Sequence, residues 1–176
     1  METTNVPVIT VKITRYKEGR EQQFSLSFPK SEITDKITNE TVTFAEEFGT
    51  YLGTDEVVKR VDKKGATYFD PVIVHLTTSQ LRRFFGEVKR LQMSGYNETA
   101  LVLLKPKLAY AVARANANSE KKIPNKIEYL YKIIVEMIDI VKASPNQESS
   151  FKNFILFFEA IVAYHKKAEE TKTHKK

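Results

Sequence analysis

The segment at residues 151–165, with the sequence FKNFILFFEAIVAYH, constrains the fold more than any other. At 100° per residue, its large side chains fall within one broad arc of a helix. The residues of that arc are Phe151, Phe154, Ile155, Phe158, Ile161, Val162 and His165. Leu156 and Phe157 widen the apolar surface further. A helix that is apolar on so much of its circumference is usually the central rod of a bundle, so the segment predicts a mainly α-helical domain.

Three further long helices are predicted before this segment, at about 77–91, 97–115 and 124–143. Thr77 and Gln80 have the spacing of a capping box at the start of the first helix. Pro106 lies inside the second helix and is expected to kink it, because proline has no N–H to donate to the carbonyl of Val102. These segments are long enough to pack around the apolar rod.

Two shorter helices are predicted upstream, at about 43–52 and 55–65. Thr43 and Glu46 have the spacing of a capping box for the first, and Gly53 ends it. Thr54 is placed to cap the second, which carries acids in its first turn and bases in its last. The helical part of the chain is therefore expected to form a compact bundle of about five to six helices.

Residues 8–28 predict a β-hairpin in front of the bundle. Alternation places Ile9, Val11 and Ile13 on one side of its first strand, and Gly19 supplies the turn. Because an isolated two-stranded hairpin is marginal in water, its apolar side is expected to lie on the main domain or on a partner. The predicted organisation is an N-terminal hairpin appendage at 1–40, a helical bundle at 41–167 and a disordered basic tail at 168–176.

Composition excludes several classes of protein. The chain has no cysteine, which rules out disulfides, thiolate zinc sites and cysteine nucleophiles. Its first residues, METTNVPVIT, lack the charged and apolar regions of a secretory signal, and no apolar run approaches the roughly 20 residues that span a bilayer. We therefore expect a cytoplasmic protein that makes no membrane contact.

Candidate catalytic residues are few. His165 lies on a helix without a second metal ligand at HxxxH or HExxH spacing, and it is interpreted as a structural histidine near a helix C-terminus. Glycine-rich phosphate loops and the GxSxG sequence are absent. A nuclease that uses Glu136, Asp139 and His165 is the weakest alternative. We expect no catalytic residue, no metal and no cofactor.

Basic residues are the better candidates for function. Residues 82–176 hold 18 Lys and Arg against 10 Asp and Glu, and Lys107 and Arg114 lie seven positions apart on one helical line. The candidate RNA-binding residues are Arg82, Arg83, Lys89, Lys105, Lys107, Arg114 and Lys166. Such side chains on adjacent helices can line a phosphate backbone, or they can be solvated faces whose stems cover the core. Both interpretations stay open from the pattern alone.

Three stretches in order carry a family resemblance: LTTSQLRRFFGEVKRL (76–91), LLKPKLAYAVARA (103–115) and FILFFEAIVAYHK (154–166). Together they resemble the small subunit of the type III-A (Csm) CRISPR interference complex. The resemblance covers roughly residues 42–167, and residues 1–40 have no counterpart in these motifs. It implies a compact helical bundle without a catalytic site. It also implies several stacked copies that line the channel where target RNA pairs with guide RNA.

The resemblance also implies partners and sites. The partners are guide and target RNA, the guide-holding backbone subunits, the large cyclase-bearing subunit and neighbouring copies. Arg82 or Arg83 matches the family's basic position after TTSQ, Lys107 and Arg114 fall in its second basic segment, and Lys166 ends the last motif. Phosphate contacts position a protein without reading sequence, which suits such a subunit. The alternative is a purely architectural helical bundle that contacts acidic protein partners without binding RNA.

Overall fold

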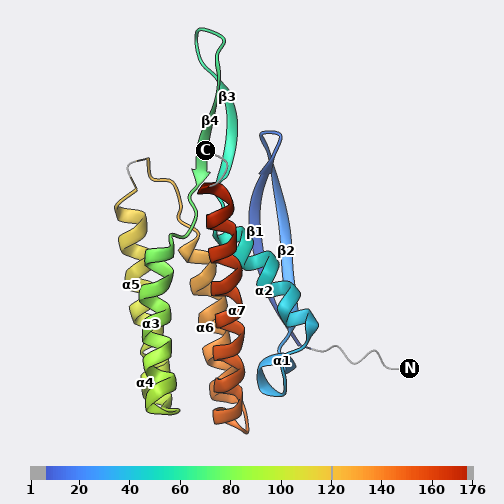
Figure 1. Cartoon of the computed structure of the whole chain (residues 1–176), viewed down its shortest axis with the longest axis vertical. Helices are drawn as coiled ribbons and strands as arrows, with labels where there is room; N and C mark the ends of the chain where they lie inside the picture. Colours follow the sequence, from blue (N-terminus) through green and yellow to red (C-terminus); the bar gives the residue numbers. More distant parts are fainter. Residues whose placement is uncertain (1–6, 120, 174–176) are drawn as a thin grey trace, which may run out of the picture.

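The structure is a computed structural model that describes residues 7–119 and 121–173. Its elements, in chain order, are β1 (Val8–Lys17), β2 (Arg20–Pro29), α1 (Ser31–Thr34), α2 (Asn39–Leu52), β3 (Glu56–Val61), β4 (Thr67–Ile73), α3 (Thr78–Ser94), α4 (Glu98–Val102), α5 (Leu104–Ala117), α6 (Ile127–Ala143) and α7 (Gln147–Thr173). In Figure 1, α3, α4 and α5 lie on one side, α6 and α7 in the middle, and α2 with the β1–β2 hairpin on the other side. The predicted mainly helical bundle with an N-terminal β-hairpin is confirmed.

Helix α7 is the central rod that its sequence predicts. Phe154, Phe158 and Ile161 are fully buried, and the helix contacts α1, α2, α3 and α6. The ring of Phe158 meets those of Phe84 and Phe85 from α3 edge-on at 5.5 and 5.6 Å between centroids. Aromatic pairs of this geometry add to the stabilisation from buried apolar area. The rod thus joins the α3 side of the molecule to the α2 side.

Helices α2 and α7 cross at very short range because glycine lies at the contact. A Cβ atom on Gly49 would lie 2.7 Å from the carbonyl oxygen of Ile161, and one on Gly53 would lie 2.8 Å from that of His165. The spacing of the two glycines, four residues apart, puts both on the same face of α2. Only residues without a side chain allow the two backbones to approach this closely.

The β1–β2 hairpin packs its apolar face into the same core as the helices. Its antiparallel register pairs Ile9 with Phe28 and Val11 with Leu26. Phe28 is buried with its ring centroid 4.7 Å from that of Phe44 in α2 and 4.8 Å from that of Phe157 in α7. Of the two possible locations for this face, the main domain is therefore the one observed.

The predicted helix at 55–65 is wrong, because these residues form β3 and the turn to β4. The segment contains the β-branched residues Val57, Val58 and Val61, which favour a strand once a partner is available. The turn is held by Asp62, whose Oδ1 atom accepts hydrogen bonds from the backbone N–H groups of Lys64 and Ala66 at 2.8 Å each. The β3–β4 hairpin projects beyond the ends of the helices (Figure 1).

Helix boundaries in the C-terminal half differ from the predicted ones. The predicted helix at 97–115 consists of two helices, α4 and α5, which are separated at Leu103. Leu103 directly follows Val102, whose carbonyl receives no helical hydrogen bond from Pro106 because proline has no N–H. Helix α6 begins at Ile127 rather than at residue 124. Asn146 caps the start of α7, because its side-chain oxygen accepts the N–H of Ser149 at 3.1 Å.

Two further ends also differ. Helix α2 begins after Thr38, whose side chain accepts the N–H of Glu40, so the predicted capping box at Thr43 is wrong. Helix α7 continues through residues 168–173, where a disordered tail was expected, and residues 174–176 lie outside the described part. Glu169 accounts for this continuation, because its carboxylate accepts hydrogen bonds from the start of α3.

Candidate nucleic-acid interface

A groove of about 730 Å³ lies between α3, α5, the base of β4 and the segment from residue 118 to residue 127. Arg83 from α3 and Lys107 and Arg114 from α5 line it, together with Lys121 from the connecting segment. All four side chains are exposed. Three of the seven predicted RNA-binding residues are thus brought together with a fourth cation that the sequence did not single out.

Helix α5 presents two of these cations because of its amphipathic pattern. Leu104 and Leu108 are buried on one side of the helix, while Lys107 and Arg114 share a line on the exposed side. Tyr110 lies between them on the same side, with 69% of its surface exposed. The neighbouring α3 adds Arg83, because the buried Leu81 and Phe84 anchor the opposite side of its first turns.

The two walls of the groove are joined by backbone pairing. Val74 donates its N–H to the carbonyl of Pro124 and accepts the N–H of Lys126, each at 3.0 Å, which forms an isolated parallel bridge. The side chain of Asn125 donates to the carbonyl of His75 at 3.4 Å. These contacts hold the segment after α5 against the strand that leads into α3, so the cations on both walls keep a defined separation.

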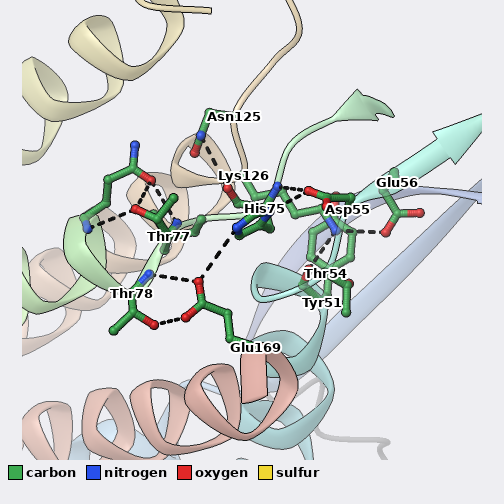
Figure 2. A network of polar contacts seen from close by, with 12 residues as sticks. Tyr51, Thr54, Asp55, Glu56, His75, Thr77, Thr78, Asn125, Lys126 and Glu169 are labelled. Atoms are coloured by element: carbon green, nitrogen blue, oxygen red, sulfur yellow. Dashed lines mark hydrogen bonds and ion pairs between the residues drawn. The ribbon is translucent and has the colours of Figure 1, made fainter. Parts of the chain in front are cut away.

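A second network orients the start of α3 (Figure 2). His75 lies between two carboxylates: its Nδ1 atom is 2.6 Å from Asp55, and its Nε2 atom is 3.8 Å from Glu169. Glu169 also accepts the N–H of Thr78 at 3.0 Å. The predicted capping box of Thr77 and Gln80 is present in full. The end of α7 and the start of α3 are therefore tied together one turn before Arg83.

Lys126 anchors the network from inside the core. Its side chain is completely buried, donates to Oε1 of Glu56 at 2.8 Å and to the carbonyl of Tyr51 at 2.7 Å, and lies 3.5 Å from the centre of the Tyr51 ring (Figure 2). Burial lowers the pKa of Lys126 to about 8, and the Glu56 carboxylate opposes this shift. The second oxygen of Glu56 accepts the N–H of Tyr16 at 3.0 Å, so the pair also holds the N-terminal hairpin.

The four groove cations differ in their partners. Lys107 donates to Glu87 at 2.5 Å and Lys121 to Asp70 at 3.0 Å, and these hydrogen bonds lower the pKa of each carboxyl. Within the described part of the chain, the guanidinium groups of Arg83 and Arg114 make no ion pair. The two arginines therefore carry positive charge that no acid among the described residues compensates.

The other predicted RNA-binding residues lie outside this groove. Lys89 pairs with Glu159 of α7, Lys105 pairs with Asp139 of α6, and Lys166 pairs with Glu170 one turn on. Arg82 is exposed, but it is not among the residues that line the groove. The structure therefore separates Arg83 from Arg82, which the sequence left equivalent.

Lys121 is the groove residue that sequence reasoning missed. It belongs to the short Lys-Lys pair at residues 121–122, which carried no helical pattern to place it on a face. Only the fold of the segment after α5 brings it beside α5. The adjacent lysines were the one signal that could have marked the segment as part of a basic surface.

The residues of the nuclease alternative do not form one site. His165 is buried, and its Nε2–H donates to the carbonyl of Leu76 at 2.5 Å. Because α7 continues to Thr173, His165 does not lie in the last turn of its helix. Glu136 and Asp139 line a different groove, which does not include His165. Among the described residues there is no group of three or more His, Asp and Glu side chains that could hold a metal, and no helix is long and apolar enough to cross a membrane.

A comparison with family models identifies the chain. The model described as Csm2 Type III-A matches residues 52–171, which is more than half of the protein. Searches of curated proteins and of solved structures returned no match. The chain therefore belongs to the Csm2 family, the small subunits of the type III-A CRISPR (Csm) complex. The family match begins beyond the N-terminal hairpin and includes the whole groove.

Proposed function

We propose that this member of the Csm2 family is a non-catalytic subunit that binds RNA by its phosphate backbone within a type III-A CRISPR ribonucleoprotein. In this proposal several copies stack along the complex in the cytoplasm, beside the guide-holding subunits and the large cyclase-bearing subunit. They contact the guide RNA and the target RNA during antiviral defence. Membership of the family supports the assembly in this proposal, and the basic groove between α3 and α5 supports the RNA contact.

The clustering of Arg83, Lys107, Arg114 and Lys121 is the observation that carries the proposal. Cations that neutralise phosphates release condensed counterions, which makes binding strong at low salt and largely independent of sequence. Guide pairing already supplies sequence recognition, so such a contact is sufficient. We propose that Arg83 rather than Arg82 faces RNA. Lys89, Lys105 and Lys166, which are held by acids of the same chain, contribute less.

Binding of a fluorescent single-stranded RNA to the purified chain, titrated at several salt concentrations, tests this proposal. Charge reversal of Arg83, Lys107 and Arg114 to Glu should weaken binding of every sequence and flatten the plot of log affinity against log salt by about 0.7 per lost phosphate contact. Lys152→Glu is the matched control, because Lys152 is exposed on α7 and its ion-pair partner among the described residues is Glu148 of its own helix. Equal effects of the control and of the groove variants would refute the assignment of the groove.

Purification of the tagged chain from its native host tests the assembly. We expect co-purifying short RNAs that share one repeat-derived end, together with the guide-holding subunits. If those subunits are recovered with guide RNA but the groove variants bind single strands as well as the unmodified chain does, the architectural alternative is favoured.

A further inference from the structure

We propose that the groove takes one unstacked nucleotide of a single strand, with its phosphate on the cations and its base on the apolar floor beside Tyr110. The inference rests on the proposed function and specifies the form of RNA that this site binds. The first observation is that the residues lining the groove are more apolar than a contact with phosphate requires. The apolar lining residues are Pro71, Val74, Ala111, Ala115, Ile123 and Ile127.

The volume of the groove is the first support. A volume of about 730 Å³ is within the range of about 300–1,000 Å³ that is typical of pockets for small organic molecules. The phosphates of a helical duplex lie on its outside, where surface cations can contact them without an apolar pocket. An apolar hollow behind the cations adds nothing to that contact, but it can remove the flat face of a base from water.

Tyr110 is the second support. Its ring is 69% exposed although it is large and apolar, and it lies three residues after Lys107 and four before Arg114 on the outer side of α5. A base that stacks on an aromatic side chain gains about 1–3 kcal/mol without regard to its identity. The bases of a duplex are already stacked on one another, so only an unpaired and unstacked base can use this ring.

The charges of the groove complete the site. Arg83 on α3 and Arg114 on α5 line the same groove as Tyr110 from two walls, and neither guanidinium is neutralised by an acid within the described residues. A phosphate attached to a base on the floor would meet cations on both sides. A nucleotide fits this site better than an acidic protein surface does. Its base can contact the apolar residues and the exposed ring of Tyr110, and its phosphate can contact the two arginines.

Three RNA probes test the inference: a labelled single strand, the same strand with abasic positions, and a duplex of the same length. Tyr110→Ala and Ala115→Leu change the ring and fill the floor without changing charge. We expect each to weaken single-strand binding by about 5- to 150-fold and to leave duplex binding and the salt dependence unchanged. The abasic strand should bind the unmodified chain as weakly as the complete strand binds Tyr110→Ala.

Phe69→Ala is the matched control, because Phe69 is 68% exposed on β4 and does not line the groove. Its affinity for the single strand should equal that of the unmodified chain. Duplex binding as tight as single-strand binding, with no effect of Tyr110→Ala or Ala115→Leu, would overturn the inference while leaving the proposed function intact. No binding of any probe by the folded chain would overturn both.

Discussion

The crossing of α2 and α7 predicts that one added methyl group at Gly49 destabilises the fold. A Cβ atom there would lie 2.7 Å from the carbonyl oxygen of Ile161, 2.9 Å from Cβ of Tyr164 and 3.1 Å from the backbone nitrogen of His165. Two of these three atoms belong to the α7 backbone, so no side-chain rotation relieves the overlap. Gly49→Ala must therefore push the central rod away from α2.

The magnitude follows from two opposing effects. Overpacking of a well-packed contact costs about 1–3 kcal/mol. Alanine recovers up to about 1 kcal/mol over glycine in a helix. We therefore expect Gly49→Ala to lower the free energy of unfolding by up to about 2 kcal/mol. Gly86→Ala is the control, because Gly86 is exposed within α3 and a Cβ atom there would meet nothing within 4 Å. That variant should be more stable by about 0.5–1 kcal/mol.

Urea unfolding followed by helical circular dichroism measures both variants. If the slope of the free energy against urea stays constant, the midpoints report stability directly, and they should move in opposite directions. A Gly49→Ala protein that is stabilised as much as Gly86→Ala would refute the reasoning, because it would mean that α2 and α7 are not in close contact at this position.

The buried Lys126–Glu56 pair supports two further predictions. Lys126→Met leaves the Glu56 carboxylate without its buried partner, so urea unfolding should show a loss of about 3–5 kcal/mol, much of it restored by adding Glu56→Gln. Burial lowers the pKa of Lys126 to about 8 from the usual value of about 10.4, so the unfolded chain holds the extra proton between these values. The unfolding free energy of the unmodified chain relative to Lys126→Met should therefore rise by about 2.5 kcal/mol from pH 8 to pH 10.4, and a flat difference would contradict this.

The bundle could be predicted because burial leaves a periodic signal in the sequence. Helix α7 needs apolar side chains on most of its surface, since it packs against elements on both sides of the molecule. The first hairpin likewise shows Ile9, Val11 and Ile13 at alternate positions, because one of its faces is buried. The capping box at Thr77 marks a helix start with local hydrogen bonds alone. Features of this kind depend on neighbours in sequence, so they can be read from it.

The β3–β4 hairpin could not be predicted because most of it is not buried. Val61 is 64% exposed and Phe69 is 68% exposed, so no alternation of buried and exposed residues separates a strand from a helix here. The close packing of Gly49 and Gly53 was missed for a related reason. Glycines four residues apart indicate a helix contact only when the partner helix is known, and that partner lies more than 100 residues later in the chain.

The helices of the candidate site could be predicted from the sequence, but the set of residues that line the groove could not. Lys107 and Arg114 share a helical line that spacing alone reveals. The choice of Arg83 over Arg82 depends on the rotation of α3, which the contact of Glu169 with Thr78 helps to set. Lys121 enters only because Val74 pairs with Asn125. The groove is thus a product of long-range contacts that no local pattern records.

The internal acids of the groove set how strongly RNA can bind there. Lys107 and Lys121 are each ion-paired with a carboxylate, so a phosphate can pair with either lysine only by displacing Glu87 or Asp70. Arg83 and Arg114 pair with no acid among the described residues, so a phosphate can bind them without such an exchange. We therefore expect a salt slope of about −1.4 for a single strand, which corresponds to two phosphates, rather than the −2.8 of four independent cations. Glu87→Gln should release Lys107 and steepen the slope by about 0.7. A slope that stays at about −1.4 in that variant would refute this reasoning, because it would show that Lys107 does not contact a phosphate even without Glu87.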